Sequence, residues 1–504
     1  MTSSDHSPEG PDLTQGIPLT SIPPCGMIAG HVDGSPALLV QLEDGLYACS
    51  GSCTHYGAPL AEGMFVADEV RCPWHHACFN IRTGEALHAP AFSPLTCWQV
   101  EVIDGIAYVR AEHLLQAPSP PHLKHPRPES IVIIGGGAAG YAAAHRLREL
   151  GYPGTLTLLS ADTAAPYDRP NLSKDYLAGT AQEDWMPLQG PEYYAEQKID
   201  LHLACSVTAI DPQAHEVIAS NGDTWPYDAL LIATGAQPRR VSFTGSERPE
   251  VFVLRSMADA QAIIKACQGA TTVALVGAGF IGMEAAAALR SRGLDVHVIA
   301  PEAVPMAYAL GNELGNLLTA LHQEHGVVFH LGCGVTDFDG KHVTLTDGTS
   351  LAAQLLIVGT GVAPCTELAA AAGLAVDNGI LVDAHLQTSA AGIFAAGDVA
   401  RYPHGNERIR VEHWVHAQRQ GQTAAANMLG AGMAFTDVPF FWTHHHGLEL
   451  RCTGFTGGWD AMRIQGDLAQ HDFTARFFRA TSLVAAVSAG RDLENLAIEA
   501  ALRD

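Results

Sequence analysis

Residues 131–140 read Ile-Val-Ile-Ile-Gly-Gly-Gly-Ala-Ala-Gly. The four β-branched residues of this stretch predict a buried strand, its glycines a tight turn, and the alanine-rich sequence after them a helix. Residues 273–282, Val-Ala-Leu-Val-Gly-Ala-Gly-Phe-Ile-Gly, repeat the same order. One G-x-G-x-x-G can arise where a helix packs closely on a strand. Two copies, each between a strand and a helix, predict two Rossmann-like α/β units that bind dinucleotides.

In each unit the glycines let the backbone approach a pyrophosphate at the helix N-terminus. These glycines are Gly135, Gly137 and Gly140 in the first unit and Gly277, Gly279 and Gly282 in the second. An acidic residue, Asp162 or Glu302, follows about 20 residues later, where dinucleotide sites place the side chain that binds a ribose. No Lys or Arg lies between Ala303 and His322 to bind a 2′-phosphate. We therefore expect the second unit to prefer NADH to NADPH.

Upstream, Cys53-Thr-His55 is followed after sixteen residues by Cys72-Pro-Trp-His75. Two cysteines and two histidines can hold a structural zinc ion, but zinc fingers pair Cys with Cys and His with His in short spacers. Here each motif offers one of each, which fits a cluster with two thiolates on one iron and two imidazoles on the other. The stretch resembles the Rieske ferredoxin family. The resemblance implies a [2Fe–2S] cluster held by these four residues.

Two positions distinguish branches within the Rieske family. High-potential members carry a disulfide that braces the two ligand loops, and the matching residues here are Ala58 and Trp74. The resemblance is therefore to the lower-potential, ferredoxin-like branch. Cys78 and Cys97 are expected to serve as small buried apolar side chains.

The segment Pro166-Tyr-Asp-Arg-Pro-Asn-Leu-Ser-Lys174 matches the PYDRPxLSK pattern of the apoptosis-inducing factor and oxygenase-coupled ferredoxin reductase family. Most of residues 130–504 resembles this family, with further matches at 233–235, 277–284, 396–398 and 412–414. The resemblance places several residues from and around these motifs in the cofactor sites: Arg169, Ala233, Gly235, Gly361, Glu412, His413 and Trp414.

The same resemblance implies individual roles at a bound FAD. Asp398 would hold the ribityl chain, Asp162 the adenosine ribose, and the backbone of Val207 the adenine. Lys174 would lie near flavin N5 and pair with Glu284, both acting in catalysis. A cation at N5 can stabilise the reduced flavin, whereas a salt bridge without flavin contact is the alternative for this lysine.

The composition bounds the location and the partners. The chain has 504 residues, a formal net charge of −25 and eleven cysteines. That charge argues against nucleic acid or an anionic membrane as a partner. Residues 1–16 lack the basic and apolar regions of a signal peptide, no apolar run reaches the length of a membrane span, and an odd cysteine count does not indicate a disulfide framework. We therefore expect a cytoplasmic protein without membrane insertion.

The pattern along the chain predicts a multidomain protein. Short β-type runs between Gly and Pro turns predict an all-β Rieske domain over residues 17–112, and the proline-rich stretch 113–129 predicts a linker. An FAD-binding domain is expected over 130–248 and 376–432, around an NAD-binding domain at 249–375. Strand-like runs near the end of the chain predict a small α+β C-terminal domain over 433–504.

The cysteine positions constrain where electrons can go. No cysteine lies between Cys97 and Cys205, and the chain has no C-x-x-C, so we do not expect a redox disulfide beside the flavin. Electrons from NADH are expected to pass through FAD to the [2Fe–2S] centre and on to an unidentified acceptor, the flavin dividing a two-electron donation into single steps. The alternative is an NADH-responsive redox sensor or interaction protein with little turnover. A homodimer is a further expectation.

Residues 439–447 read PFFWTHHHG. Three consecutive histidines in an extended segment alternate between faces, so they cannot all ligate one metal ion. The family resemblance instead places this segment against the flavin, as a wall of the active site.

Overall fold

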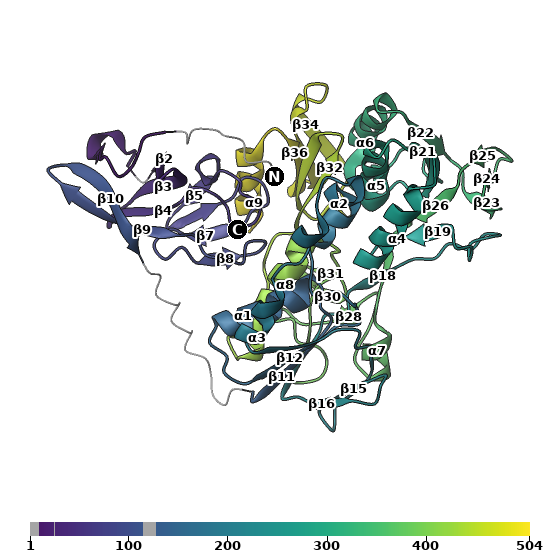
Figure 1. The fold of residues 1–504 in the computed structure, drawn as a ribbon, viewed down its shortest axis with the longest axis horizontal. Coiled ribbons are helices and arrows are strands. Elements are labelled where there is room, and N and C mark those ends of the chain that lie inside the picture. Colours follow the sequence, from purple (N-terminus) through teal and green to yellow (C-terminus); the bar gives the residue numbers. More distant parts are fainter. Residues whose placement is uncertain (1–9, 25, 114–127, 504) are drawn as a thin grey trace.

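The computed structural model describes residues 10–24, 26–113 and 128–503, so most of the expected linker at 113–129 lies outside the described residues. The N-terminal β domain lies beside the C-terminal domain, and two α/β units complete the molecule (Figure 1). Within the described ranges, none of the helices combines the length and apolar character needed to cross a bilayer.

Two antiparallel sheets form the N-terminal domain. Side chains alternate along β3 (Ser35–Leu42) between two cores, Leu38 and Val40 on one face and Ala37 and Leu39 on the other, because successive residues of a strand point to opposite faces. The larger sheet has the order β1 (Ile17–Pro18), β10 (Ile106–His113), β9 (Cys97–Ile103), β4 (Gly45–Ser50), β3 (Ser35–Leu42), β2 (Met27–Val32). The smaller sheet has the order β5 (Met64–Val66), β6 (Glu69–Arg71), β7 (Cys78–Asn80), β8 (Ala86–His88).

The first α/β unit is built on a parallel sheet. Its order is β13 (Ile199–His202), β12 (Thr155–Leu159), β11 (Ser130–Ile134), β17 (Ala229–Ile232), β29 (Ile393–Ala395). Helix α1 (Ala138–Glu149) follows β11, and α8 (Trp414–Met428) packs on it. The two helices lie very close, because a Cβ atom at Gly421 would come within 2.2 Å of the carbonyl oxygen of Ala139. Segments on both sides of the second unit therefore build this sheet and its helical layer.

The second α/β unit repeats the arrangement. Its parallel sheet has the order β19 (Val251–Val253), β26 (Leu355–Val358), β20 (Thr272–Val276), β21 (Asp295–Ala300), β22 (Val327–Leu331). Its helices are α4 (Met257–Cys267), α5 (Phe280–Ser291) and α6 (Ala307–Glu324). A capping box of Ser256 and Asp259 begins α4, satisfying N–H groups that lack partners within a helix.

The C-terminal domain consists of one antiparallel sheet and α9 (Asp492–Arg503), which packs on β33 and β36. The sheet order is β32 (Phe440–His445), β33 (Leu448–Gly454), β36 (Ser482–Ala489), β35 (Asp472–Arg479), β34 (Ala461–Asp467).

Shorter elements connect these layers. The helices are α2 (Asp175–Ala178), α3 (Pro191–Glu196) and α7 (Glu367–Ala371). The strands form four small sheets: β14 (Val207–Asp211), β15 (Glu216–Ala219) and β16 (Thr224–Pro226); β18 (Ala236–Pro238) and β27 (Val362–Pro364); β23 (Val335–Phe338), β24 (His342–Leu345) and β25 (Ser350–Ala352); β28 (Ile380–Leu381), β30 (Ala400–His404) and β31 (Glu407–Ile409).

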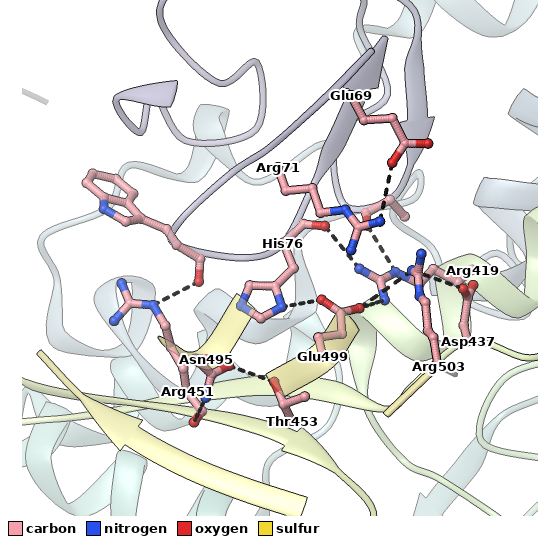
Figure 2. A network of polar contacts seen from close by, with 12 residues as sticks. Glu69, Arg71, His76, Arg419, Asp437, Arg451, Thr453, Asn495, Glu499 and Arg503 are labelled. Carbon is pink, nitrogen blue, oxygen red and sulfur yellow. Dashed lines mark hydrogen bonds and ion pairs between the residues drawn. The ribbon is translucent and has the colours of Figure 1, made fainter. Parts of the chain in front are cut away.

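A buried polar network joins the N-terminal domain to the rest of the chain (Figure 2). Arg419 on α8 donates to the carbonyl oxygen of His76 at 3.0 Å and pairs with Glu499 on α9 at 2.8 Å. The other carboxylate oxygen of Glu499 lies 2.5 Å from His76 Nδ1. Arg451 on β33 donates to the carbonyl oxygen of Trp74 at 3.0 Å. Because a buried charge without its partner is costly, this network favours the docked arrangement.

Candidate flavin and iron–sulfur sites

One cavity of about 1030 Å³ connects the two glycine turns. It begins at the N-terminus of α1, beside Gly135 and Gly137, and reaches the N-terminus of α5 at Gly279. Helix N-termini carry unpaired N–H groups and a partial positive charge, and both favour bound phosphate. The cavity therefore has a phosphate-binding end in each α/β unit.

The first glycine turn fits a pyrophosphate. No side chain caps the N-terminus of α1, so the N–H groups of its first turn are free to bind an anion. A Cβ atom at Gly140 would lie 1.8 Å from the carbonyl oxygen of Gly135, so only glycine allows the helix to begin this close to the strand. Gly135 and Gly137 line the cavity, whereas Gly140 packs behind the turn.

The second glycine turn has the same construction. No side chain caps α5 after Gly279, and a Cβ atom at Gly282 would lie 2.3 Å from the carbonyl oxygen of Gly277. Gly279 lines the cavity, whereas Gly277 and Gly282 provide the close packing behind it. Glu302, the predicted ribose ligand, is exposed after β21 and does not line this cavity.

Charged side chains along the cavity suit an anionic cofactor. Asp398 accepts a hydrogen bond from Arg255 Nη2 at 2.8 Å. Arg169 also lines the cavity, and its buried Nε has no partner among the described residues. Burial lowers the pKa of Arg169, and the nearby Arg255 adds to this effect. A buried guanidinium with an unused donor fits a site that binds a diphosphate.

The remaining predicted flavin residues divide into two groups. Most line the cavity: Asp162, Ala233, Gly235, Gly361, Glu412, His413 and Trp414. Asp162 accepts a hydrogen bond from Tyr167 at 2.8 Å, and Glu412 pairs with Arg410 at 2.6 Å. Val207, at the start of β14, does not line the cavity.

Lys174 and Glu284 meet on the cavity wall although they are far apart in sequence. Lys174 follows the 3₁₀ helix η3 (Arg169–Ser173), and its Nζ lies 2.8 Å from Oε2 of Glu284 on α5. Ser173 Oγ donates to the same oxygen at 2.5 Å, and Thr443 Oγ1 donates to Oε1 at 2.6 Å. Glu284 is buried. Three donors therefore hold this carboxylate in one orientation next to the cavity.

Aromatic side chains close the cavity on the side of β32. Phe441 and Trp442 line it, and the His413 ring stacks on Phe441 with ring centroids 4.1 Å apart. Burial lowers the pKa of His413 to about 4, so its ring is neutral near pH 7. Such a wall limits the access of water to the reacting groups.

The four predicted cluster ligands lie at the tips of two loops. Cys53 and His55 follow β4, whereas Cys72 and His75 follow β6. The Nδ1 atoms of the two histidines face each other at 3.2 Å, and the two thiols form a second pair. Burial lowers the pKa of His55 to about 3 and that of His75 well below its usual range, so both imidazoles are neutral, as metal ligation requires.

This arrangement separates the four ligands into one sulfur pair and one nitrogen pair. Within the described ranges, no three His, Cys, Asp or Glu side chains converge as ligands of a single ion. A tetrahedral zinc site would bring all four to one centre. The two pairs instead fit a two-iron cluster with different ligands on each iron.

The cluster loops lie directly against the flavin cavity. The ring of His75 packs on Trp442 with centroids 4.1 Å apart, and Trp442 itself lines the cavity. Tyr56 stacks on His55 at 3.9 Å, and its hydroxyl donates to Asp168 in the PYDRP segment. One indole therefore separates His75, a predicted cluster ligand, from the cavity.

Sequence reasoning missed several residues of these sites. Arg255, Tyr56 and Thr443 each complete a contact with a residue more than 100 positions away, and no local pattern marks them. The segment 439–447 was expected to form a wall of the cavity. Its Phe441 and Trp442 line the cavity, whereas its histidines 444–446 do not.

The fold and both sites define a reductase with two dinucleotide units and an N-terminal iron–sulfur domain. The chain belongs to the pyridine nucleotide-disulphide oxidoreductase family, whose model matches residues 129–421, and residues 19–99 match the Rieske [2Fe-2S] domain. This membership confirms the expected family resemblance and fold class, and it implies FAD, NAD(H) and a [2Fe–2S] cluster as cofactors.

Known relatives cover most of the chain. Apoptosis-inducing factor 3 of Homo sapiens is 33% identical over 475 residues, which span 90% of this chain and 78% of that protein. Rhodocoxin reductase of Rhodococcus erythropolis is 36% identical over 375 residues, 73% of this chain and 88% of the relative. The solved covalent putidaredoxin reductase–putidaredoxin complex matches with a TM-score of 0.73 at 32% identity, covering 75% of this chain and 94% of the other. The protein is thus a ferredoxin reductase-like, NAD-dependent oxidoreductase with a Rieske domain.

Proposed function

We propose that this protein oxidises NADH at an FAD held in the cavity and passes the electrons one at a time to its own Rieske centre, and from there to a separate acceptor. The observation that supports this route is the position of Trp442, which lines the cavity and packs on His75. A covalently attached redox centre in contact with the flavin site is the natural first acceptor, because tethering keeps its effective concentration high.

The chain's own residues have distinct tasks in this proposal. FAD supplies hydride acceptance and one-electron release; the protein supplies position and electrostatic field. The N-termini of α1 and α5 bind the two pyrophosphates. Lys174, oriented by Glu284, provides a fixed positive charge at the reacting end of the cavity. The wall of Phe441 and Trp442 excludes water.

We further propose that NADH is preferred to NADPH. Glu302 follows β21 at the position where dinucleotide sites bind a ribose diol. A carboxylate there repels a 2′-phosphate, and residues 303–322 contain no Lys or Arg to offset that repulsion. The preference therefore rests on charge at the second dinucleotide unit.

The terminal acceptor is proposed to be a one-electron carrier of the ferredoxin type. The relatives include a rhodocoxin reductase and a reductase solved in complex with putidaredoxin. Here the first acceptor is part of the same chain, so a second carrier would take electrons from the Rieske centre.

Substitution of the bridging indole tests the route. Trp442→Ala should keep FAD and its reduction by NADH but slow cluster reduction by at least about tenfold, since the contact between His75 and the cavity wall is lost. Trp442→Phe retains an aromatic ring, so its rate of cluster reduction should lie between those of the wild-type protein and Trp442→Ala. Trp225→Ala, on the distant strand β16, is the matched control. Unchanged cluster reduction in Trp442→Ala would refute the proposed route through this contact.

A further inference from the structure

A row of polar side chains leads from Glu284 away from the cavity. Thr443 Oγ1 donates to Glu284 Oε1 at 2.6 Å, and the same hydroxyl lies 2.9 Å from Nε2 of His445. Because the Thr443 proton is used by the carboxylate, its oxygen accepts the proton of His445 Nε2. Thr443 and His445 are fully buried.

Two further histidines extend this row. His445 Nδ1 lies 3.2 Å from Nε2 of His322 on α6, and His322 Nδ1 lies 3.3 Å from Nε2 of His446. His322 is fully buried, whereas His446 is partly exposed and stacks on the exposed His325 with centroids 4.0 Å apart. The row therefore connects a buried carboxylate at the cavity with the protein surface.

The hydrogen bonds require one consistent set of tautomers. With Glu284 ionised, each of the three rings carries its proton on Nε2 and donates toward the carboxylate. With all three protons on Nδ1, every bond is reversed, and the hydroxyl of Thr443 accepts from a protonated Glu284. The two arrangements differ by one proton on the carboxylate. Conversion between them moves one proton between Glu284 and the outer nitrogen of His446.

Neutral imidazoles suit such a transfer, because each ring needs one donor and one acceptor nitrogen. Burial lowers the pKa of His445 to about 3 and that of His446 to about 4. The positive charge of Lys174 also lowers the pKa of His445, and that of Arg290 lowers the pKa of His446, because a nearby cation disfavours an imidazolium. Burial also lowers the pKa of His322 well below its usual value, so all three rings are uncharged near pH 7.

The proposed reaction produces a proton that has to leave the cavity. Oxidation of one NADH gives NAD⁺, two electrons and one proton. The Rieske centre accepts electrons one at a time and passes them to the terminal acceptor, so the proton must reach solvent by another path. At this end the cavity is lined by Phe441 and Trp442, and the N-terminal domain packs against Trp442 through His75.

We propose that Thr443 and the three histidines 445, 322 and 446 form the proton path between Glu284 and solvent, an inference that rests on the proposed function. Glu284 accepts the proton at the cavity, the neutral rings pass it on by exchanging tautomers, and His446 Nδ1 releases it at the surface.

His446 lies in the turn between β32 and β33. The two strands are joined by His446 and Gly447, with φ of 49° and 88°. A two-residue hairpin turn with positive φ at both positions favours Asn-Gly, and histidine is among the non-glycine residues that adopt positive φ more often than most.

The variant His446→Asn separates a proton-path role from a structural one. It creates the favoured Asn-Gly turn, so the fold should remain intact, yet it removes the last ring of the path. Holoenzyme is mixed with NADH and excess ferricyanide in weakly buffered solution, and an indicator dye follows proton release. We expect proton release to slow severalfold, and to recover when imidazole is added to the buffer. A wild-type rate without imidazole overturns the proposal.

A second variant interrupts the path at its buried centre. His322→Phe keeps an aromatic ring between α6 and β32 and should slow proton release by at least about tenfold, while NADH still bleaches the flavin at the wild-type rate. His330→Gln is the matched control, since it breaks the 3.0 Å pair between His297 and His330 elsewhere in the second α/β unit. If His322→Phe does not fold, the proton-release rate of His446→Asn alone tests the proposed path.

A measurement without turnover completes the test. In the resting protein labelled with ¹⁵N-histidine, with signals assigned from single variants, the rings of residues 445, 322 and 446 should all be neutral with their protons on Nε2. A mixed set of tautomers, or a charged ring, overturns the path. Ferricyanide accepts electrons from either redox group, so proton release is tested even if the cluster is not on the electron route. A cluster that stays oxidised would contradict the proposed function alone.

Discussion

Replacement of Arg419 by methionine should release the N-terminal domain from its docked position. Arg419 is 1% exposed and donates to two carbonyl oxygens of that domain, those of His76 at 3.0 Å and Ala89 at 3.3 Å. It also pairs with Glu499 on α9. Burial alone would raise the pKa of Glu499, but Arg419 and His76 hold it well below its usual range. Without Arg419, a buried carboxylate would lose its main partner.

The size of the effect follows from these contacts. Two hydrogen bonds from a charged donor contribute about 1.5–3 kcal/mol each, and removing one partner of a buried ion pair costs about 3–5 kcal/mol. The loss of Arg419 is therefore expected to weaken docking by about 3–5 kcal/mol. The equilibrium between docked and undocked forms should then shift by about two to three and a half powers of ten. Arg419→Met combined with Glu499→Leu should be less damaging than the sum of the single changes, because no unpaired charge remains.

Solution scattering and rapid kinetics measure this shift. In Arg419→Met the radius of gyration should increase, and the single first-order phase of cluster reduction should become slower. The control is Arg491→Met, which removes a solvent-exposed pair of 2.8 Å with Asp472 on the C-terminal sheet and should leave docking unchanged. An Arg419→Met protein with wild-type scattering and wild-type cluster reduction would refute the view that this network holds the domain.

Four further outcomes are expected. The purified protein should contain two irons and two acid-labile sulfides with a Rieske-type EPR signal after reduction, and His75→Cys should keep a cluster of lower potential; zinc in their place would contradict the ligand assignment. kcat/KM should favour NADH by at least about tenfold, or about 1.4 kcal/mol, and Glu302→Gln should reduce that ratio; equal efficiency with NADPH would place a phosphate-binding residue elsewhere. Lys174→Ala and Glu284→Ala should keep FAD but slow its reduction; loss of FAD with an unchanged hydride-transfer rate in the remaining holoenzyme would assign both a structural role. Burial lowers the pKa of His445 to about 3 from 6.5, so below pH 6.5 the unfolded chain binds a proton at this ring that the folded protein does not, and the free energy of unfolding should fall as the pH drops. In His445→Asn, the change of this free energy with pH, measured by urea unfolding, should be smaller by about 1.4 kcal/mol per pH unit. An unchanged pH dependence would mean that the ring is not held neutral.

The fold could be predicted wherever the decisive signal is local. A strand, a glycine turn and a helix follow one another within about a dozen residues, and the predicted turns at Gly135 and Gly277 lie at the cavity ends of β11 and β20. The cluster motif is equally compact, since each loop carries its own Cys and His. Such patterns reflect chemistry that a few consecutive residues must satisfy together, so sequence is sufficient to find them.

The docking of the domains and the histidine row could not be predicted in this way. His76 and Glu499 are 423 positions apart, and His322 and His445 are 123 apart, so no periodicity relates them. The alternation rule for an extended segment places His446 on the face opposite to His445. It did not foresee that His446 lies in a turn with positive φ, from which it contacts the same partner, His322, as His445 does. Long-range pairs of this kind are determined by packing rather than by local sequence.

In the proposed route, the Rieske centre receives electrons from the flavin of its own chain. This transfer can be measured by stopped-flow mixing with NADH, with the flavin and cluster absorbance bands followed separately. Cluster reduction should trail flavin reduction with a first-order rate that is independent of protein concentration, because the loop of His75 is docked on the cavity wall at Trp442. A rate that rises in proportion to protein concentration would show transfer between molecules, and a cluster that stays oxidised would rule out transfer from the flavin.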